Sequence, residues 1–226
     1  MQNKDLTVII PALNEERILR ACLDSVKRLD PLEIIVVDGG SADRTAKIAE
    51  EAGAVIIQSP KGRGIQMNKG ASLARGEILL FLHADTRMPE MKKPFASATP
   101  NSYAGGFFHL TFDDGSVSTR LVEFFANLRA RLFSLPYGDQ AIFIKKEIFE
   151  KLGGFREYPF LEDIDFAIRI KKYGKLKYIP LKVVASSRRL KKGFPFSPIL
   201  ISFRNVFIAL LFLFGLSPFR LIKLYK

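Results

Sequence analysis

The sequence predicts an α/β fold: a mainly parallel sheet flanked by helices, with a hydrophobic and basic helical appendage at the C-terminal end. Two observations indicate the sheet. Short β-branched runs alternate with helical patterns over residues 6–83, and the links between them are short. Strands joined in this way pair in parallel through right-handed crossovers. A third observation, a strongly apolar segment at 194–216, indicates the appendage.

The first strands are expected at 6–10 and 33–37, with an amphipathic helix over 15–28 between them. Pro11 ends the first strand, and Asn14 is the expected N-cap of the helix. The pattern then predicts a helix from Ser41 to about Ala52, a strand at 54–58, a helix around 66–74 and a strand at 77–83. Ligands of parallel sheets bind at the carboxyl ends of the strands, so the residues that follow each strand should share one rim.

The second half has a less regular pattern. Strands are expected at 105–114 and 141–146, and a helix is expected over 161–174 because its acidic first turn and basic last turn suit the helix dipole. An amphipathic helix over 118–133 has its apolar positions at Leu121, Phe124, Phe125, Leu128 and Leu132. No linker is evident, so we expect one domain over residues 1–190 and a helical tail over 191–226.

Composition limits the class of protein. Hydrophobic residues make up 48% and charged residues 26%, which excludes disordered and collagen-like chains. Cys22 is the single cysteine, so there is no intramolecular disulfide framework. The N-terminus lacks the cationic and apolar regions of a secretory signal, which favours a cytoplasmic protein. The net charge of +12 is uneven, because residues 166–226 contain 14 Lys and Arg and no acid. This segment indicates an anionic partner: phosphate groups, lipid headgroups or nucleic acid.

Five motifs occur in a fixed order along the chain: VIIPALNEE, VVDGGSADRT, LLFLHAD, GDQAIFIKKEIFEKLGGF and LEDIDF. Together they resemble the family 2 glycosyltransferases with the GT-A fold over residues 6–174. HAD stands in place of the family's usual DAD or DDD, as in a small bacterial-type subgroup that the chain resembles. The resemblance implies an inverting hexosyltransferase-type enzyme. It would move a sugar from a nucleoside-diphosphate sugar, expected to be UDP-linked, to a hydroxyl acceptor.

The nucleotide is expected to bind at the first two strand ends. Asp38 can accept a hydrogen bond from a pyrimidine ring N–H, and Gly39 lets the backbone approach the ligand closely. In the resembled family the aspartate matching Asp38 reads uracil, and the residue matching Glu15 contacts the ribose. The other expected nucleotide contacts are Pro11, Ala12 and Asn14. Structural alternatives stay open, because DGGS also suits a turn and helix cap and Glu15 suits a helix N-terminus.

The diphosphate is expected between the basic loop at 59–70 and the end of the strand at 77–83. Lys61 and Arg63 could hold phosphate oxygens, together with backbone N–H groups. Asp85 matches the position where the resembled family binds Mn²⁺ or Mg²⁺, and one carboxylate plus two phosphate oxygens suits such a cation. His83 replaces the first acid of that motif. It would contact ribose or phosphate, or simply face the sheet.

Two further segments are candidates for the chemistry. The resemblance implies that Asp163 is the base for the acceptor hydroxyl, with Glu162 supporting its orientation. Stabilisation of the helix dipole by an acidic first turn is the alternative. Gly138, Asp139 and Gln140 are expected to line the acceptor or donor-sugar pocket, and a turn before the next strand is the alternative there.

The tail suggests a membrane surface. Its longest uninterrupted apolar run, Val206 to Phe214, has nine residues, whereas a helical span needs about 20. An interfacial helix on the inner face of the cell membrane is therefore favoured. The basic residues expected to meet anionic headgroups are Arg188, Arg189, Lys191, Lys192, Arg220, Lys223 and Lys226. Packing on the catalytic domain, a homo-oligomer contact and a true span are the alternatives. The tail also motivates the hypothesis of a lipid-linked acceptor.

Other functions fit the sequence less well. Nucleic-acid binding is disfavoured because the basic segment carries Phe and aliphatic residues but no Trp and no nucleic-acid motif. A sugar-nucleotide nucleotidyltransferase would need a Gly-rich loop around residues 11–17, where the chain has PALNEER. A non-catalytic sugar-nucleotide-binding protein is the remaining alternative. The transferase hypothesis requires Asp38, Asp85 and Asp163 to converge on one cleft.

Overall fold

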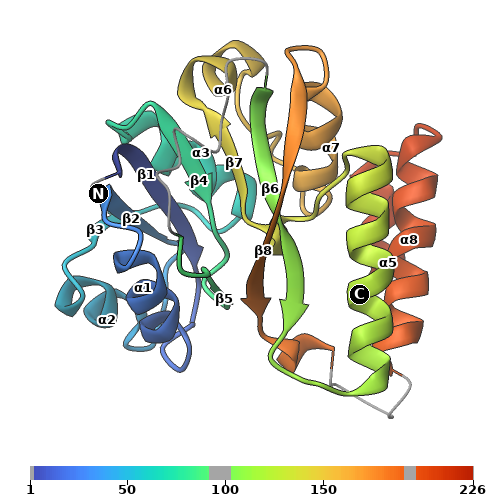
Figure 1. Ribbon diagram of the computed structural model, residues 1–226, viewed down its shortest axis with the longest axis horizontal. Helices are drawn as coiled ribbons and strands as arrows, with labels where there is room; N and C mark the ends of the chain where they lie inside the picture. Colours follow the sequence, from blue (N-terminus) through green and yellow to red (C-terminus); the bar gives the residue numbers. More distant parts are fainter. Residues whose placement is uncertain (1–2, 92–102, 191–196, 226) are drawn as a thin grey trace.

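The computed structural model describes residues 3–91, 103–190 and 197–225, in which one eight-stranded sheet lies between layers of helices (Figure 1). The strand order is β3-β2-β1-β4-β7-β6-β8-β5. The strands are β1 (Asn3–Ala12), β2 (Pro31–Asp38), β3 (Val55–Gln58), β4 (Ile78–Phe81), β5 (Thr86–Arg87), β6 (Tyr103–Phe112), β7 (Ile142–Lys145) and β8 (Lys175–Ala185). This arrangement confirms the predicted α/β class.

The N-terminal half of the sheet is parallel, as predicted. Strand β1 pairs in parallel with β2 and β4, and β2 pairs in parallel with β3. Alternate residues of β1 point to opposite faces. Val8 packs in the core beneath α1 (Leu19–Lys27) and α2 (Thr45–Glu51), whereas Ile9 packs in the core beneath α3 (Arg63–Leu73). Because every β-to-β connection here passes through a helix, the carboxyl ends of β1, β2 and β4 lie at one edge.

The C-terminal half of the sheet is mixed. Strand β7 is antiparallel to both β4 and β6, β8 is parallel to β6, and β5 is antiparallel to β8. Strand β8 has no counterpart among the predicted elements. Its sequence, KLKYIPLKVVA, alternates lysines with apolar residues around Pro180, and the register with β6 shifts at that proline. Because of the proline and the lysines, the local pattern of residues 175–185 does not resemble that of a strand. Only some residues of this strand are buried.

Two helices begin later than predicted. Helix α1 begins at Leu19, so Asn14 is not its N-cap, and α2 begins at Thr45 rather than Ser41. Asn14 has φ 55°; its N–H donates to Ser41 Oγ, and its Oδ1 accepts from the Ala42 N–H. The polar residues expected to cap helices instead join the two loops that follow β1 and β2.

Helix α5 (Val117–Phe133) presents its apolar stripe outward. The five apolar positions named in the sequence are all exposed, whereas an amphipathic helix usually turns such a stripe to the core. The inward face carries small and polar residues instead, among them Ala130 and Asn127. The Asn127 side-chain amide bonds both backbone groups of Leu110 in β6, at 2.8 and 2.9 Å. These two hydrogen bonds hold the Asn127 side of α5 against β6, so the apolar stripe on the other side faces solvent.

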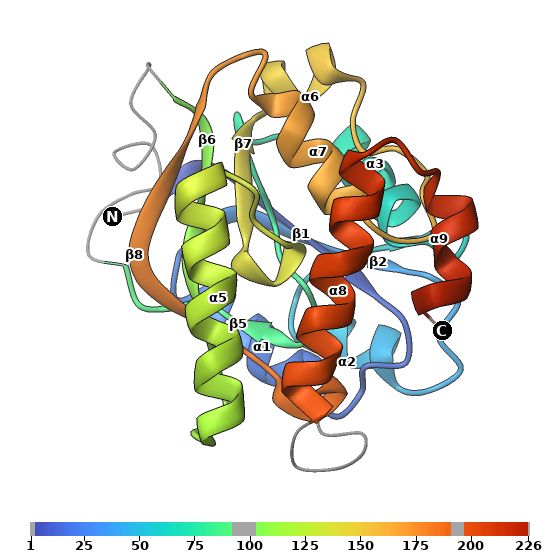
Figure 2. The ribbon, with the colours of Figure 1, turned by 90° about the vertical axis from the view of Figure 1, so that its right-hand side faces the viewer.

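The tail folds back on the rest of the chain. It contains α8 (Ser197–Leu213) and α9 (Pro218–Tyr225), and α8 runs beside α5 in both views (Figures 1 and 2). Ile208 and Leu221 form a buried cluster with Phe160, which precedes α7 (Glu162–Ile170). Across the described ranges, every helix is too short or too polar to cross a bilayer. The division of the chain at residue 190 stays a prediction.

Candidate active site

A cavity of about 250 Å³ lies where the ends of β4 and β8, the turn before β7, α7 and α8 meet. It brings together segments that are far apart in the sequence. Its lining residues are Arg63, His83, Asp85, Phe112, Tyr137, Gly138, Asp139, Phe160, Leu161, Asp163, Ala185, Ser186, Leu190, Ile201, Arg204, Asn205 and Ile208. Six of the predicted site residues, including the metal candidate Asp85 and the base candidate Asp163, therefore share one cavity.

Asp163 lies at the start of α7, and two backbone N–H groups hold its carboxylate. Its Oδ2 accepts from the Gly138 N–H at 2.8 Å, and its Oδ1 accepts from the Ile164 N–H at 2.8 Å. Gly138 opens the 3₁₀ turn η1 (Gly138–Gln140). Leu161, the residue before α7, has φ 66°, which turns the chain sharply into the helix. The carboxylate at the wall of the cavity is thus fixed in position.

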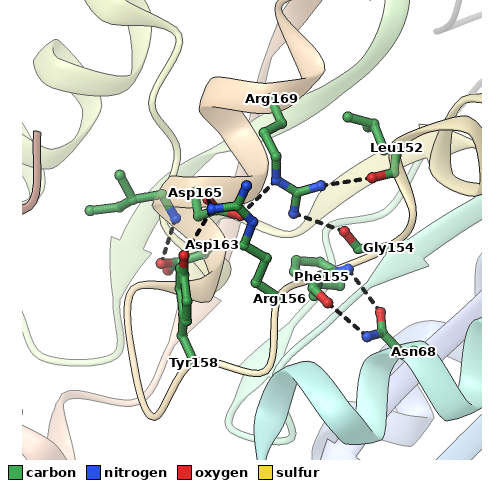
Figure 3. Close-up of polar contacts among 10 residues, drawn as sticks. Asn68, Leu152, Gly154, Phe155, Arg156, Tyr158, Asp163, Asp165 and Arg169 are labelled. Carbon is green, nitrogen blue, oxygen red and sulfur yellow. Dashed lines mark hydrogen bonds and ion pairs between the residues drawn. The ribbon is translucent and has the colours of Figure 1, made fainter. Parts of the chain in front are cut away.

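A second set of polar contacts holds α7 against the loop before it (Figure 3). Arg169 donates from Nε to Asp165 at 2.7 Å and from Nη2 to the Gly154 carbonyl at 2.8 Å. Asn68 of α3 bonds both backbone groups of Phe155 at 2.8 Å. Buried Asp165 therefore has a structural partner, and the loop before α7 is tied to α3.

Glu162 and Arg63 join α7 to the start of α3. Arg63 Nε lies 2.7 Å from Glu162 Oε1, and Glu162 is 2% exposed. Glu162 Oε2 is buried and has no hydrogen-bond partner among the described residues. Burial raises the pKa of Glu162; Arg63 opposes this rise and Asp163 adds to it. Arg63 thus lines the cavity while paired with Glu162, and Lys61 is exposed on the loop before α3.

Asp139 is the most perturbed carboxyl group in the cavity. Burial raises its pKa to about 6; Arg129 opposes the rise, and Asp163 and Asp85 add to it. Its Oδ1 is buried and finds no donor within the described part of the chain. Its neighbour Gln140, also predicted to line the pocket, is fully buried and does not line the cavity. Gln140 Oε1 accepts from the Tyr137 N–H at 3.2 Å, which stabilises the turn.

His83 and Asp85 follow β4 at the base of the cavity. The His83 ring packs against Gly138, where a Cβ atom would overlap Nε2 of the ring. The Asp85 carbonyl accepts from the Ser186 N–H at 2.9 Å, which ties the end of β4 to the end of β8. In the ranges that the structure describes, no group of three or more His, Cys, Asp or Glu is placed to hold a metal ion.

The predicted nucleotide residues after β1 and β2 lie outside this cavity. Asp38 is 2% exposed; its carboxylate accepts from the Ser41 hydroxyl and, at 3.1 Å, from both the Ser41 N–H and Gln58 Nε2. Its backbone pairs with Ala12, whose carbonyl accepts from the Gly39 N–H at 2.9 Å. Pro11 and Ala12 are buried at the end of β1. Of the three carboxylates expected to converge on one cleft, Asp85 and Asp163 line this cavity and Asp38 does not.

Glu15 pairs with a residue that the sequence assigned elsewhere. Its carboxylate forms an ion pair with Arg188, and its N–H donates to Thr45 Oγ1 at 2.8 Å. Arg188 lies in the 3₁₀ turn η2 (Ser187–Arg189) that follows β8, so it is used within the protein rather than free for headgroups. Lys191, Lys192 and Lys226 lie outside the described residues. The basic run around Arg188 in the sequence does not indicate that Arg188 pairs with Glu15.

Helix α8 supplies a wall of the cavity that the motifs did not indicate. Ile201, Arg204, Asn205 and Ile208 recur at helical spacing and line it. Asn205 Oδ1 is buried without a hydrogen-bond partner among the described residues. The one available signal was the presence of Arg204 and Asn205 in the middle of an apolar segment. Two polar residues at adjacent positions of such a helix mark the side that faces a polar cavity.

Comparisons with known proteins assign the family. Residues 7–153 match Glycosyl transferase family 2. The PGL/p-HBAD biosynthesis glycosyltransferase of Mycobacterium bovis (strain BCG / Pasteur 1173P2) is 34% identical over 177 residues, which cover 72% of this chain and 68% of that protein. The probable glycosyltransferase YdaM of Bacillus subtilis is 27% identical, with 79% of this chain and 49% of YdaM covered.

Solved structures show the same fold at low identity. Staphylococcus aureus TarS has a TM-score of 0.63 at 16% identity, covering 100% of this chain and 69% of TarS. Glucosyl-3-phosphoglycerate synthase from Mycobacterium tuberculosis has a TM-score of 0.58 at 21% identity, covering 91% of this chain and 78% of that one. With the matched family region, the relative and the cavity beside the ends of β4 and β8, the chain belongs to glycosyl transferase family 2 and is a glycosyltransferase.

Proposed function

We propose that this enzyme transfers a sugar from a UDP-sugar to a hydroxyl acceptor, with inversion at the anomeric carbon. The observation that carries the proposal is the cavity that Arg63, Asp85, Asp139 and Asp163 share. It combines a basic group for a diphosphate with several carboxylates for a cation and a proton. Related structures support the choice of donor, since TarS was solved with UDP-GlcNAc and the mycobacterial synthase with UDP and Mn²⁺.

In this proposal the nucleotide lies along the strand ends that lead to the cavity. Asp38 and Glu15 are placed to read the base and the ribose, and Pro11, Ala12, Asn14 and Gly39 supply the surrounding backbone. Both carboxylates have partners within the protein, so nucleotide binding would use them together with Ser41 and Arg188. Lys61 and Arg63 then face the diphosphate. His83, whose ring packs against Gly138, would contact the ribose or a phosphate.

Asp163 is the proposed base. It takes the proton from the acceptor hydroxyl as that oxygen attacks the anomeric carbon and the bond to the nucleoside diphosphate breaks. The two backbone N–H groups that hold its carboxylate fix its direction, which keeps the base oriented without further rearrangement. Glu162 orients the site through its ion pair with Arg63. Gly138 and Asp139 line the acceptor or donor-sugar side, with Gln140 supporting their turn.

The residues of the cavity fit a divalent cation held mainly by the substrate. Burial raises the pKa of Asp139, Asp163 and Asp85 add to the rise, and one buried Asp139 oxygen has no donor in the described part of the chain. Carboxylate oxygens are ligands that suit Mn²⁺ or Mg²⁺. We assign Asp85 as the protein ligand. A cation bound there would neutralise charge on the departing diphosphate.

A thermal-shift experiment tests the donor. UDP, GDP and ADP are added to the full chain with and without Mn²⁺, and we expect UDP to raise the melting temperature most, by mass action. Mn²⁺ should increase the UDP shift, and Asp85→Asn should remove that increase, whereas Glu150→Gln, a change on the exposed face of α6 (Lys146–Leu152), should keep it. If no nucleoside diphosphate shifts the melting temperature, the proposed donor is wrong.

We also propose where the enzyme acts. The basic, apolar tail favours a peripheral position on an anionic membrane, at the inner face of the cell membrane. A lipid-linked hydroxyl acceptor would suit this position. Contact between two copies of the chain through the tail is the alternative use of the same residues. Measurement of sugar transfer to lipid extracts and to water-soluble acceptors would distinguish acceptors that are anchored in lipid from free ones.

A further inference from the structure

Helices α5 and α8 present a shared apolar surface to solvent. They pack against each other, and both lie on the side that faces the viewer in Figure 2. Phe124 is 59% exposed and Phe203 is 68% exposed. We call the exposed apolar residues of these two helices the docking face. Its central members are Leu121, Phe124, Leu128, Leu200, Phe203 and Phe207.

The docking face is not needed to hold the two helices in place. Helix α5 is attached to the sheet by its opposite side, through Asn127 and Ala130. Helix α8 is attached through Ile208, which is 1% exposed and packs with Phe160 and Leu221. The exposed stripes therefore contribute little to folding. Large apolar side chains gathered on one exposed side of a protein often mark an interaction site.

The charges around the docking face indicate its partner. Helices α5, α8 and α9 together contain six basic residues and a single acid; of the basic ones, Arg204 lines the cavity on the opposite side of α8. That acid, Glu123, turns inward and accepts from the Phe112 N–H at 2.6 Å. Arg120, Arg131 and Lys223 are exposed. A second copy of the chain would bring two positively charged rims together, which is unfavourable. Anionic lipid headgroups around an apolar layer match the surface in both charge and polarity.

We propose that α5 and α8 together form a membrane-docking face for a bilayer that contains anionic lipid. The new element is α5, because the tail alone would leave half of this surface unused. On α8 the exposed stripe and the residues that line the cavity lie on opposite sides of one helix. Docking would therefore place the cavity close to the lipid surface. The docking itself does not depend on the proposed donor or base.

Flotation with lipid vesicles tests the proposal on the full chain. Wild type is mixed with vesicles of phosphatidylcholine alone or with added phosphatidylglycerol. The double variant Phe124→Asp/Phe203→Asp changes one residue on each helix. Leu73→Asp is the matched control, because Leu73 is 53% exposed at the end of α3, away from the docking face. We expect wild type and Leu73→Asp to float with the anionic vesicles and the double variant to partition at least about tenfold less.

Single variants separate the two helices. Phe124→Asp alone should weaken flotation, because α5 is part of the docking face; unchanged flotation of this variant would contradict the proposal. Failure of wild type to float, or equal flotation on neutral and anionic vesicles, would also overturn it. A dimer of wild type that the double variant dissociates, without vesicle binding, would assign the face to a second copy instead. The UDP thermal shift of the same variants reports the proposed function independently.

Discussion

Three carboxyl groups at and beside the cavity have three different environments, although their chemistry is the same. Asp163 is held by two backbone N–H groups, Glu162 is paired with Arg63, and one oxygen of Asp139 has no donor among the described residues. Enzymes assign distinct roles to neighbouring acids through such differences. The fixed, cavity-lining Asp163 suits proton transfer. The half-buried Asp139, with its perturbed pKa, suits a position next to bound positive charge.

Asp163→Asn should lower kcat by about a thousandfold, because the amide cannot accept the acceptor's proton and general-base catalysis contributes factors of this size. The UDP thermal shift should stay nearly unchanged, since the proposed nucleotide residues lie on other strand ends. Steady-state transfer or UDP-sugar hydrolysis measures the first effect. Glu150→Gln, which removes an exposed carboxylate of α6, is the control and should retain activity. Full activity of the Asn variant would refute the assignment.

Asp139 predicts a specific pH dependence of stability. Its pKa is about 6 in the folded protein against an ordinary value of 3.8, so the folded state binds this proton more tightly. Stability should therefore fall as the pH rises through the window between these values, by as much as about 3 kcal/mol. Asp139→Asn removes this loss. Its melting temperature should exceed that of wild type at pH 7 and approach it near pH 4.

The control for Asp139→Asn is Asp5→Asn, which makes the same change of net charge at an exposed position. Melting temperatures are measured for the three proteins at several pH values between 4 and 7. A difference between Asp139→Asn and wild type that does not change with pH would contradict the perturbed carboxyl group.

The sequence indicated those site residues that lie in motifs at the ends of strands and helices. His83, Asp85 and Asp163 line the cavity because their motifs end a strand or begin a helix at its edge. Arg188 and Asn205 could not be assigned in this way. Their roles depend on where η2 and α8 pack, which is a property of the tertiary structure. No local pattern distinguishes an arginine that pairs with Glu15 from one that meets a lipid headgroup.

Strand β6 approaches β7 more closely than a side chain would permit at one position. A Cβ atom at Gly105 would overlap the Phe143 carbonyl oxygen and lie 2.9 Å from Ile144 Cα, both in the backbone of β7. Gly105→Ala should therefore separate the two strands and cost ~3 kcal/mol, a typical penalty for overpacking. For a chain of this size the melting temperature should fall by roughly 10 °C.

Gly115→Ala is the matched control for Gly105→Ala. The nearest neighbour of a Cβ atom there is Arg120 Nη2, at 3.9 Å, so the melting temperature should change little. Thermal unfolding followed by circular dichroism compares the two variants. Equal stability of Gly105→Ala and Gly115→Ala would show that β6 and β7 can separate without penalty.

Elements with strong periodicity were predictable, and elements defined by their neighbours were not. The parallel strands β1, β2 and β4 carry β-branched runs that belong in a buried sheet, and the structure confirms them. Strand β8 and the outward stripe of α5 escaped prediction for related reasons. The lysines of β8 interrupt the apolar pattern that is expected of a buried strand. In α5, Asn127 forms hydrogen bonds with β6, and this polar side is buried in place of the apolar stripe. In both elements a tertiary contact overrides the local pattern.

Segments from near both ends of the chain come together at the candidate active site. The first strands provide the candidate nucleotide residues, and α8 provides one wall of the cavity. The ion pair of Glu15 with Arg188 connects the loop after β1 with the turn after β8. An acceptor that enters beside α8 would therefore reach Asp163 without crossing the nucleotide site. The tail would then be part of the active site.

The last prediction concerns how α8 closes the cavity. Ile208 is 1% exposed against Phe160 and Leu221, so Ile208→Ala should remove ~3 kcal/mol of packing and loosen α8. Phe207→Ala, its neighbour on the exposed side of the same helix, should leave α8 in place. Hydrogen exchange of the α8 amides should accelerate only in the Ile208 variant. The UDP thermal shift should persist in both, because the proposed nucleotide residues follow the first strands. Equal exchange in the two variants would show that α8 is not held through Ile208.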